Sequence, residues 1–198
     1  MKYALAFISI FFMVACTTTK PTITEFKIDI NVDKIESDSI GCKEKTLKIS
    51  KAFAEPSLMS LKMDYVQGKN KVFTYSQSQW VVTPAQSISK QIFFSLRDSK
   101  LFKNVNLDVS RSLSEYAVEI IIEDFMQYYD EELNTSFANV KININVIKLK
   151  DSSVVASQNF SSKIDVTTLN AEGGVEALNL ALADVVEQNL KWLVGVCK

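Results

Sequence analysis

Apolar and polar residues alternate along positions 116–166, and this pattern limits the fold more than any other feature of the chain. Three segments, beginning near Tyr116, Val140 and Val154, carry an apolar side chain at every second position. Such alternation is typical of strands that bury one face and leave the other in water. Residues 151–153 (Asp-Ser-Ser) form a polar turn between the second and third segments. The pattern predicts an antiparallel meander of long strands with one face to be covered.

Two other segments have helical spacing. The first opens at Pro84, which suits the first helical position because its missing N–H would have no partner there, and we expect it to end near Ser99. The second begins after Asn170, which can cap it, and apolar residues recur at three- and four-residue spacing as far as Leu193.

Shorter alternating segments precede the meander, at residues 26–32, 47–51, 70–76 and 102–109. The order of strands and helices indicates the α/β class. We predict a two-layer sandwich, a mostly antiparallel sheet with two main helices packed on one face. The apolar faces of these helices would fill a core or line a lipid cavity, because both need the same residues at the same spacing. Trp192, in the last turn of the second helix, would pack on the sheet or lie at lipid headgroup level.

The N-terminal residues have the layout of a secretory signal. Lys2 is followed by residues 4–14, which are apolar except for Ser9. A membrane-spanning helix needs about 20 apolar residues, so this segment is too short to span. Ala15 precedes Cys16, an arrangement that resembles the lipobox of bacterial lipoproteins, in which the cysteine is lipidated and the chain is cut before it. The alternative is an ordinary secreted protein cut elsewhere.

These signals divide the chain into three parts. We predict a lipoprotein signal peptide at 1–15, a lipidated tether at 16–24 and a single α/β domain at 25–198. Two acyl chains hold a protein stably on a membrane surface. The eight residues 17–24 reach roughly 27 Å when fully extended, so the domain stays close to the membrane that holds its anchor.

Composition excludes several classes of activity. The chain has no histidine, which excludes Ser-His-Asp and Cys-His catalysis and the histidine-containing zinc sites. Phosphate-binding glycine motifs are absent from the sequence. Without Lys2, 21 of the 22 basic residues remain against 23 acidic ones, so there is no basic excess for nucleic acid. We expect no enzyme, no cofactor and no metal site.

Cys42 and Cys197 remain once Cys16 is lipidated. In an oxidising periplasm two such cysteines often pair. A bridge across a loop this long contributes on the order of 5 kcal/mol at most. The alternative is two free thiols, one in an exposed loop and one at the C-terminus.

The densest acidic and aromatic cluster lies between two predicted strands, at Tyr128, Tyr129, Asp130, Glu131 and Glu132. Glycoside hydrolysis needs two carboxyl groups that face each other across a cleft. Consecutive acids in a turn favour a solvated hairpin tip instead. A partner-contact loop formed by the first four of these residues is the functional alternative.

One stretch of the chain, residues 75–105, carries a family pattern: a tyrosine, a tryptophan, a proline that opens a helix, apolar residues along it, then a phenylalanine and a valine. The residues are Tyr75, Trp80, Pro84, Ile88, Leu96, Phe102 and Val105. With the downstream strands and the closing helix, this pattern resembles the ABC-type transport auxiliary lipoproteins, the PqiC-like group. Many members have a basic residue before the tryptophan, where this chain has Gln79. Each motif residue also has a plain structural role; Trp80, for example, suits a buried strand-to-helix corner.

The resemblance implies a non-enzymatic partner of an ABC transporter, with its permease and ATPase, and of a protein with mammalian-cell-entry (MCE) domains. Such systems move phospholipid between the inner and outer membranes. The chain would dock the conduit or accept lipid, anchored in the outer membrane and facing the periplasm. Thr17 after the lipidated cysteine favours the outer membrane over the inner one. Bound phospholipid and a homo-oligomer are further expectations. The alternative is a structural lipoprotein that scaffolds another outer-membrane assembly without binding lipid.

Overall fold

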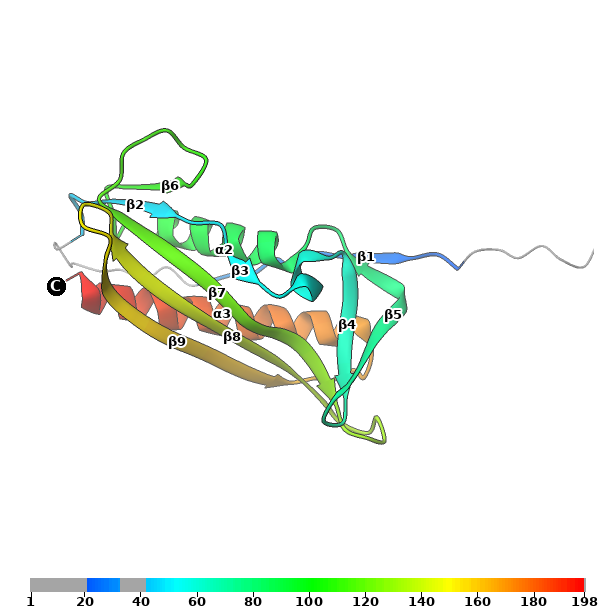
Figure 1. Cartoon of the computed structure of the whole chain (residues 1–198). Coiled ribbons are helices and arrows are strands. Elements are labelled where there is room, and N and C mark those ends of the chain that lie inside the picture. The colour runs from blue at the N-terminus through cyan, green and yellow to red at the C-terminus, as the bar shows by residue number, and fades with distance from the viewer. Residues whose placement is uncertain (1–20, 33–41, 198) are drawn as a thin grey trace, which may run out of the picture.

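The computed structural model describes residues 21–32 and 42–197 (Figure 1). The lipidation prediction for Cys16 lies outside these ranges, as do residues 1–15 and most of the tether 16–24. Among the described residues, nine strands form one sheet. In the same part of the chain, no helix is both long and apolar enough to cross a bilayer.

The predicted meander is the centre of this sheet. Strands β7 (Tyr116–Tyr129), β8 (Ser136–Lys148) and β9 (Ser153–Asp165) pair antiparallel in sequence order. Their inward side chains are mostly buried and their outward side chains mostly polar or partly exposed. The period-two pattern therefore placed the correct residues of β7 and β8 on the buried face. In β9 it was wrong for Val154, which is 61% exposed because a register shift beside Val146 turns this end of the strand over.

The other edge of β7 is shared by three short strands that lie parallel to it, one after another: β2 (Thr46–Ile49), β3 (Phe53–Ala54) and β4 (Lys62–Gln67). The remaining strands extend this part of the sheet. They are β6 (Asn104–Leu107) parallel to β2, β5 (Lys71–Trp80) antiparallel to β4, and β1 (Thr24–Phe26) parallel to β5. A single turn of 3-10 helix, η1 (Pro56–Met59), separates β3 from β4.

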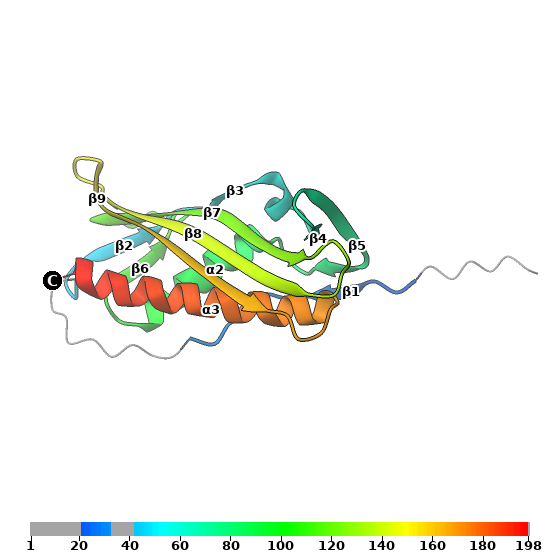
Figure 2. The same ribbon diagram turned by 90° about the horizontal axis from the view of Figure 1, so that it is seen from below.

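Two helices, α2 (Pro84–Asp98) and α3 (Ala171–Val196), cover the sheet on one face (Figures 1 and 2). Asn170 caps α3 as predicted, because its side chain accepts a hydrogen bond from the Gly173 N–H at 2.9 Å. The predicted fold class is confirmed: the architecture is α/β, with its helices on one side of a sheet whose long ladders are antiparallel. The short parallel pairings along β7 are the part that the sequence pattern did not indicate.

The apolar faces of both helices fill the core. Ile88, Leu96 and Leu182 are among the most deeply buried side chains, and they belong to one cluster with the inward residues of the sheet. Trp80 is buried in this cluster, and Trp192 packs edge-on against Phe160 with 5.6 Å between ring centroids. Of the two alternatives, the helix faces are core, and Trp192 packs on the sheet.

The predicted strand 26–32 is wrong beyond Phe26, where β1 ends. Residues 27–32, called here the N-terminal strap, have no strand partner. Instead, the Ile28 carbonyl accepts a hydrogen bond from Gln91 of α2, and the Asp29 N–H donates one to Asn179 of α3. Alternate strap residues pack on the core. An extended segment laid against two helices shows the same period as a strand, which explains the error.

A disulfide joins two segments of the described domain that are distant in the sequence. The sulfurs of Cys42 and Cys197 are bonded at 2.00 Å, with 5.1 Å between the Cα atoms, and both residues are buried. The bridge ties the segment before β2 to the residue that follows α3. Of the two alternatives for these cysteines, the structure contains the disulfide.

Candidate functional site

Helix α2 separates two surface grooves. Gln86, Lys90 and Phe94 line both of them, and we call these three residues the α2 ridge. Their spacing of four residues places them along one outer side of the helix, away from the core positions Ile88 and Leu96. The ridge therefore faces solvent while the opposite side of α2 holds the helix on the sheet.

The first groove, called the apolar groove, has a volume of about 620 Å³. It lies between α2, the β2–β3 connection, η1 and the end of β6. Its apolar lining residues are Ile49, Ala52, Met59, Ala85, Phe93, Phe94, Leu107 and Val109. Met59 is 46% exposed and Val109 is 82% exposed. This volume is within the range of small-molecule sites, which are mostly apolar with a few polar groups.

Charged groups line the same groove. Lys51 and Lys90 are exposed lining residues, and Asp108 is the acidic one. The Asp108 carboxylate accepts a hydrogen bond from the Val109 N–H at 2.8 Å, so it is engaged by its own backbone turn. The Lys90 Nζ lies 5.5 Å from the centroid of the Phe94 ring, within cation–π range. The site thus combines an apolar floor with cations at its rim.

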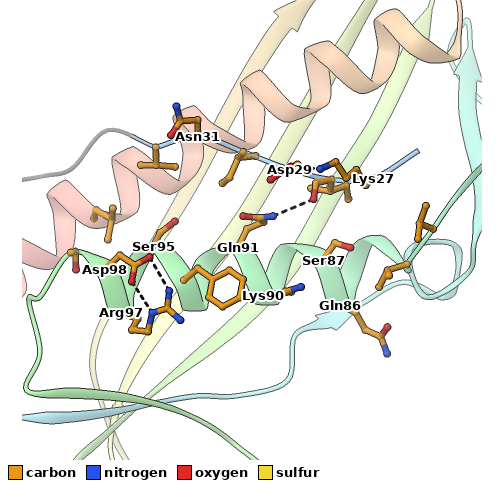
Figure 3. A pocket seen from close by; sticks show the side chains of 18 residues that line it. Lys27, Asp29, Asn31, Gln86, Ser87, Lys90, Gln91, Ser95, Arg97 and Asp98 are labelled. Atoms are coloured by element: carbon orange, nitrogen blue, oxygen red, sulfur yellow. Dashed lines mark hydrogen bonds and ion pairs between the residues drawn. The ribbon is translucent and has the colours of Figure 1, made fainter. Parts of the chain in front are cut away.

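The second groove, called the polar groove, lies between the N-terminal strap and α2 and has a volume of about 720 Å³ (Figure 3). Its charged side chains pair locally: Lys27 with Asp29 on the strap, and Arg97 with Asp98 on α2. Exposed pairs of this kind contribute about 0–1 kcal/mol. The close-up shows that the groups point along the groove without converging on a common centre. The hydrogen bond that joins the strap to α2 in this groove is the one that Gln91 donates to the Ile28 carbonyl, so the groove residues favour packing of the strap over chemistry.

The family-motif residues form the frame that positions α2. Pro84 begins the helix, Leu96 and Phe102 are buried, and the buried Trp80 ring packs 6.0 Å from the Phe125 ring. Tyr75 and Val105 are partly buried against the same core. Gln79, at the position that is basic in many family members, donates a hydrogen bond to Glu25 of β1 at 2.8 Å. The motif residues therefore affect the grooves indirectly, because they hold α2 in its position on the sheet.

The predicted partner-contact loop is only partly a loop. Tyr128 and Tyr129 are the last residues of β7, which corrects their placement. Tyr129 is buried, and the Tyr128 hydroxyl donates a hydrogen bond to Asp124 at 2.8 Å. The alternation of buried and less buried residues in β7 continues to Tyr129, beyond the point where the acidic cluster suggested a loop. Burial raises the pKa of both tyrosines and that of Asp124.

The other two residues of that cluster lie in the β7–β8 turn. The Asp130 carboxylate accepts hydrogen bonds from Asn134 and Thr135, and these bonds hold the pKa of Asp130 below its ordinary value. Glu131 pairs with Lys71 of β5 at 2.7 Å. Both acids thus stabilise hairpins, and the structure does not bring them to a cleft. A partner contact at Asp130 and Glu131 stays a prediction.

A buried polar network lies where β7 meets α3, and the sequence analysis missed it. Gln127 is 3% exposed; it accepts a hydrogen bond from the Tyr75 hydroxyl at 3.0 Å and donates to Tyr129 and Ser136 at 2.9 and 3.0 Å. A side chain on Gly174 would collide with the Gln127 amide. The signal that could have revealed the network is a glutamine at an inward position of an otherwise apolar strand.

Within residues 21–32 and 42–197, no group of three or more acidic or cysteine side chains could hold a metal ion. The apolar groove with its cationic rim is thus the candidate functional site. Its chemistry suits binding of an amphiphile.

Comparison with known proteins places the fold. No family model matches the sequence, and no curated protein matches it either. Among solved structures, protein XCC0632 from Xanthomonas campestris, described as a DUF330 family protein, is similar with a TM-score of 0.76 at 17% identity, over 87% of this chain and 96% of that one. An uncharacterized protein is similar with a TM-score of 0.66 at 9% identity, over 87% and 99% of the two chains.

Hypothetical protein CT253 from Chlamydia trachomatis is a more distant structural match, with a TM-score of 0.51 at 8% identity over 78% of this chain and 98% of that one. At such low identities the likeness concerns the fold. The chain shares the fold of the DUF330 protein XCC0632 over nearly the whole of that protein.

Proposed function

We propose that this chain is a lipid-anchored envelope lipoprotein that serves an ABC/MCE-type transporter as its docking or lipid-acceptance subunit. The transporter would move phospholipid between the inner and outer membranes, with this chain in the outer membrane facing the periplasm. The lipobox at Cys16 and the motif at residues 75–105 support the proposal at the level of sequence. The fold shared with a DUF330 protein is consistent with the resemblance.

One structural observation carries the proposal further than the sequence does. The motif residues hold α2 against the core, and this placement leaves the α2 ridge and the apolar groove at the surface. Exposed apolar surfaces with polar rims mark sites for ligands, partners or membranes. The helix that the motif residues hold in place is therefore also the helix that lines the candidate site.

The anchor geometry fits this role. The described chain begins with exposed residues 21–23 and enters the sheet at β1. A tether whose extended reach is roughly 27 Å keeps the domain beside one membrane. A partner that spans the periplasm would then have to come to the domain, and the MCE-domain protein is the proposed partner. The ABC permease and ATPase would act behind it, and several copies of this chain could surround one conduit.

Capture of the partner tests the proposal. The full-length, acylated protein carrying an affinity tag would be crosslinked in living cells and purified from the membrane fraction, and associated proteins would be identified by mass spectrometry. We expect an MCE-domain protein among them at levels well above those captured by an unrelated tagged lipoprotein of the same membrane. Capture of another outer-membrane assembly in its place would support the scaffold alternative and contradict the proposal.

A further inference from the structure

We propose that the apolar groove binds one acyl chain of an anionic phospholipid drawn from the membrane that holds the anchor, with the lipid phosphate at Lys51 and Lys90. This inference rests on the proposed function, because it needs the domain to lie beside a bilayer. It goes further by naming the site and the class of lipid.

The apolar residues of the groove come together in one lining although they belong to separate elements. Met59 of η1, Phe93 and Phe94 of α2, and Leu107 and Val109 at the end of β6 come from three separate elements and line one groove. Single exposed apolar residues are ordinary on a protein surface, whereas a contiguous apolar surface marks a binding site. A flexible unbranched chain suits such a groove, because it can follow an irregular apolar surface without leaving polar groups unpaired.

The charged side chains of the apolar groove determine which class of amphiphile it binds. Lys51 and Lys90 line the groove from two different segments, one on the β2–β3 connection and one on α2. The acidic lining residue, Asp108, is turned to its own backbone. Nearby, the Arg97 guanidinium stacks on Phe94 at 4.8 Å and is paired with Asp98. The two lysines are therefore the cations placed to meet a phosphate, which lysine binds as a point charge.

The tether identifies the source of the lipid. Cys16 lies eight residues before Thr24, where β1 begins, so the start of β1 stays within roughly 27 Å of the anchor. Phospholipid of the same bilayer is the amphiphile present at the highest local concentration there. The acyl chains of the protein's own anchor are the competing occupant, and the experiment separates the two.

Photolabelling in vesicles tests the inference. The full-length acylated protein would be reconstituted into phosphatidylcholine vesicles that contain a small fraction of phosphatidylglycerol with a diazirine on one acyl chain. After irradiation, labelled peptides would be mapped by mass spectrometry. We expect labels on the peptides that contain Met59, Phe93–Phe94 and Leu107–Val109.

Matched variants make the result specific. Val109→Asp places a charge in the groove and should lower its labelling about tenfold, because an acyl chain would then bury an unpaired carboxylate. Val154→Asp changes another exposed valine, on β9 and 61% exposed, and should leave the labelling unchanged. Circular dichroism would verify that each variant is folded, and Met59→Asp provides a second groove variant.

The charge requirement is tested separately. Lys51→Glu with Lys90→Glu should lower labelling by the phosphatidylglycerol probe more than labelling by a phosphatidylcholine probe with the same chain. Lys150→Glu, in the β8–β9 turn, is the control. Equal loss with both probes would contradict the preference for an anionic lipid, and no loss with either probe would contradict the assignment of the phosphate to the two lysines.

Two results would overturn the inference. One is labelling spread over the surface and insensitive to Val109→Asp. The other is groove labelling that appears only in the unanchored Cys16→Ser protein, which would mean that the anchor's own chains occupy the groove. Neither would change capture of the MCE-domain partner, so failure of this inference is distinguishable from failure of the proposed function.

Discussion

Gln127 and its partners show how one polar residue can fix the packing of a helix on a sheet. The Gln127 amide is buried and makes hydrogen bonds with Tyr75, Tyr129 and Ser136, from three different strands. A buried donor or acceptor that loses its partner keeps the full cost of its desolvation. The network therefore favours one arrangement of β5, β7 and β8, and the close fit of Gly174 against the amide extends this to α3.

Removal of one hydroxyl from this network should lower stability. Tyr75→Phe leaves the buried Gln127 oxygen without a partner and removes one of the two hydrogen bonds of the Tyr129 hydroxyl, so we expect the free energy of unfolding to fall by about 1–3 kcal/mol at pH 7. Urea denaturation measures the change. Tyr65→Phe is the control, because Tyr65 contacts Phe73, Tyr75 and Tyr129 through its ring. Both variants keep the ring, so equal losses would contradict a special contribution of the Tyr75 hydroxyl to stability.

The same tyrosines predict the response of stability to alkali. Burial raises the pKa of Tyr75, Tyr128 and Tyr129 in the folded protein above the ordinary value of about 10. Above that pH the unfolded chain releases protons that the folded chain retains, so the stability present below pH 10 is lost as pH rises. We expect the free energy of unfolding to decline from about pH 10 upward. Tyr75→Phe should make the decline shallower, and an unchanged slope would contradict the assignment.

Two glycines of α3 make a further matched pair. A Cβ on Gly174 would collide with the Gln127 side chain, whereas a Cβ on Gly195 has no neighbour within 4 Å. Gly195→Ala should stabilise the protein by up to about 1 kcal/mol through helix propensity. Gly174→Ala should destabilise it, because the displaced amide loses its hydrogen bonds. Thermal unfolding of the two variants would show shifts of opposite sign.

At the scale of elements, one side of α2 packs in the core and the other side lines the candidate site. Leu96 is 1% exposed, while Phe94 lines both grooves. Leu96→Ala should lower the free energy of unfolding by about 2–5 kcal/mol, since it leaves a cavity in the core. Phe94→Ala should cost much less stability and should reduce lipid labelling of the apolar groove. If Phe94→Ala proved as destabilising as Leu96→Ala, the ridge would be part of the core.

The disulfide joins the segment before β2 to the residue that follows α3. Its two cysteines are separated by 155 residues, so reduction should lower the free energy of unfolding by up to about 5 kcal/mol. Urea denaturation with and without reductant measures this, and the Cys42→Ser, Cys197→Ser double variant should match the reduced protein. An unchanged midpoint would mean that the bridge does not form in the protein as isolated.

The long elements could be predicted from the sequence because each carries its own periodicity. Helix α2 and the strands β7 to β9 satisfy a helical or a period-two pattern over ten or more residues. The strand β3 has two residues, and its parallel pairing with β7 depends on how the chain packs, which no local pattern records. The strap 27–32 alternates like a strand, yet its partners are helices.

The candidate site was less predictable than the fold for a related reason. Phe93 packs against the core and also lines the apolar groove, and helical spacing records only the first of these two roles. The groove is made from three elements that are distant in the sequence, and only the folded chain brings Met59, Phe93 and Val109 together. By contrast, the motif frame around α2 could be identified, because Trp80 and Pro84 mark it locally.

At the scale of the whole molecule, the proposed anchor and the groove define one role. The lipobox would place the domain at the outer membrane, the tether would limit its reach, and α2 would offer a surface for lipid beside that membrane. These parts have to act together, so loss of the anchor should abolish the role while leaving the fold intact. Cys16→Ser should therefore unfold at the same urea concentration as the acylated protein and yet fail in the cell.

Phospholipid asymmetry of the outer membrane is the most direct test of the proposed role. Phospholipid exposed on intact cells would be measured in the parent strain, in a strain that lacks this chain, and in that strain supplied with either the native chain or Cys16→Ser. We predict that deletion changes the exposed phospholipid, that the native chain restores the parental value and that Cys16→Ser does not. Unchanged exposure in the deletion strain would contradict a role in phospholipid transport.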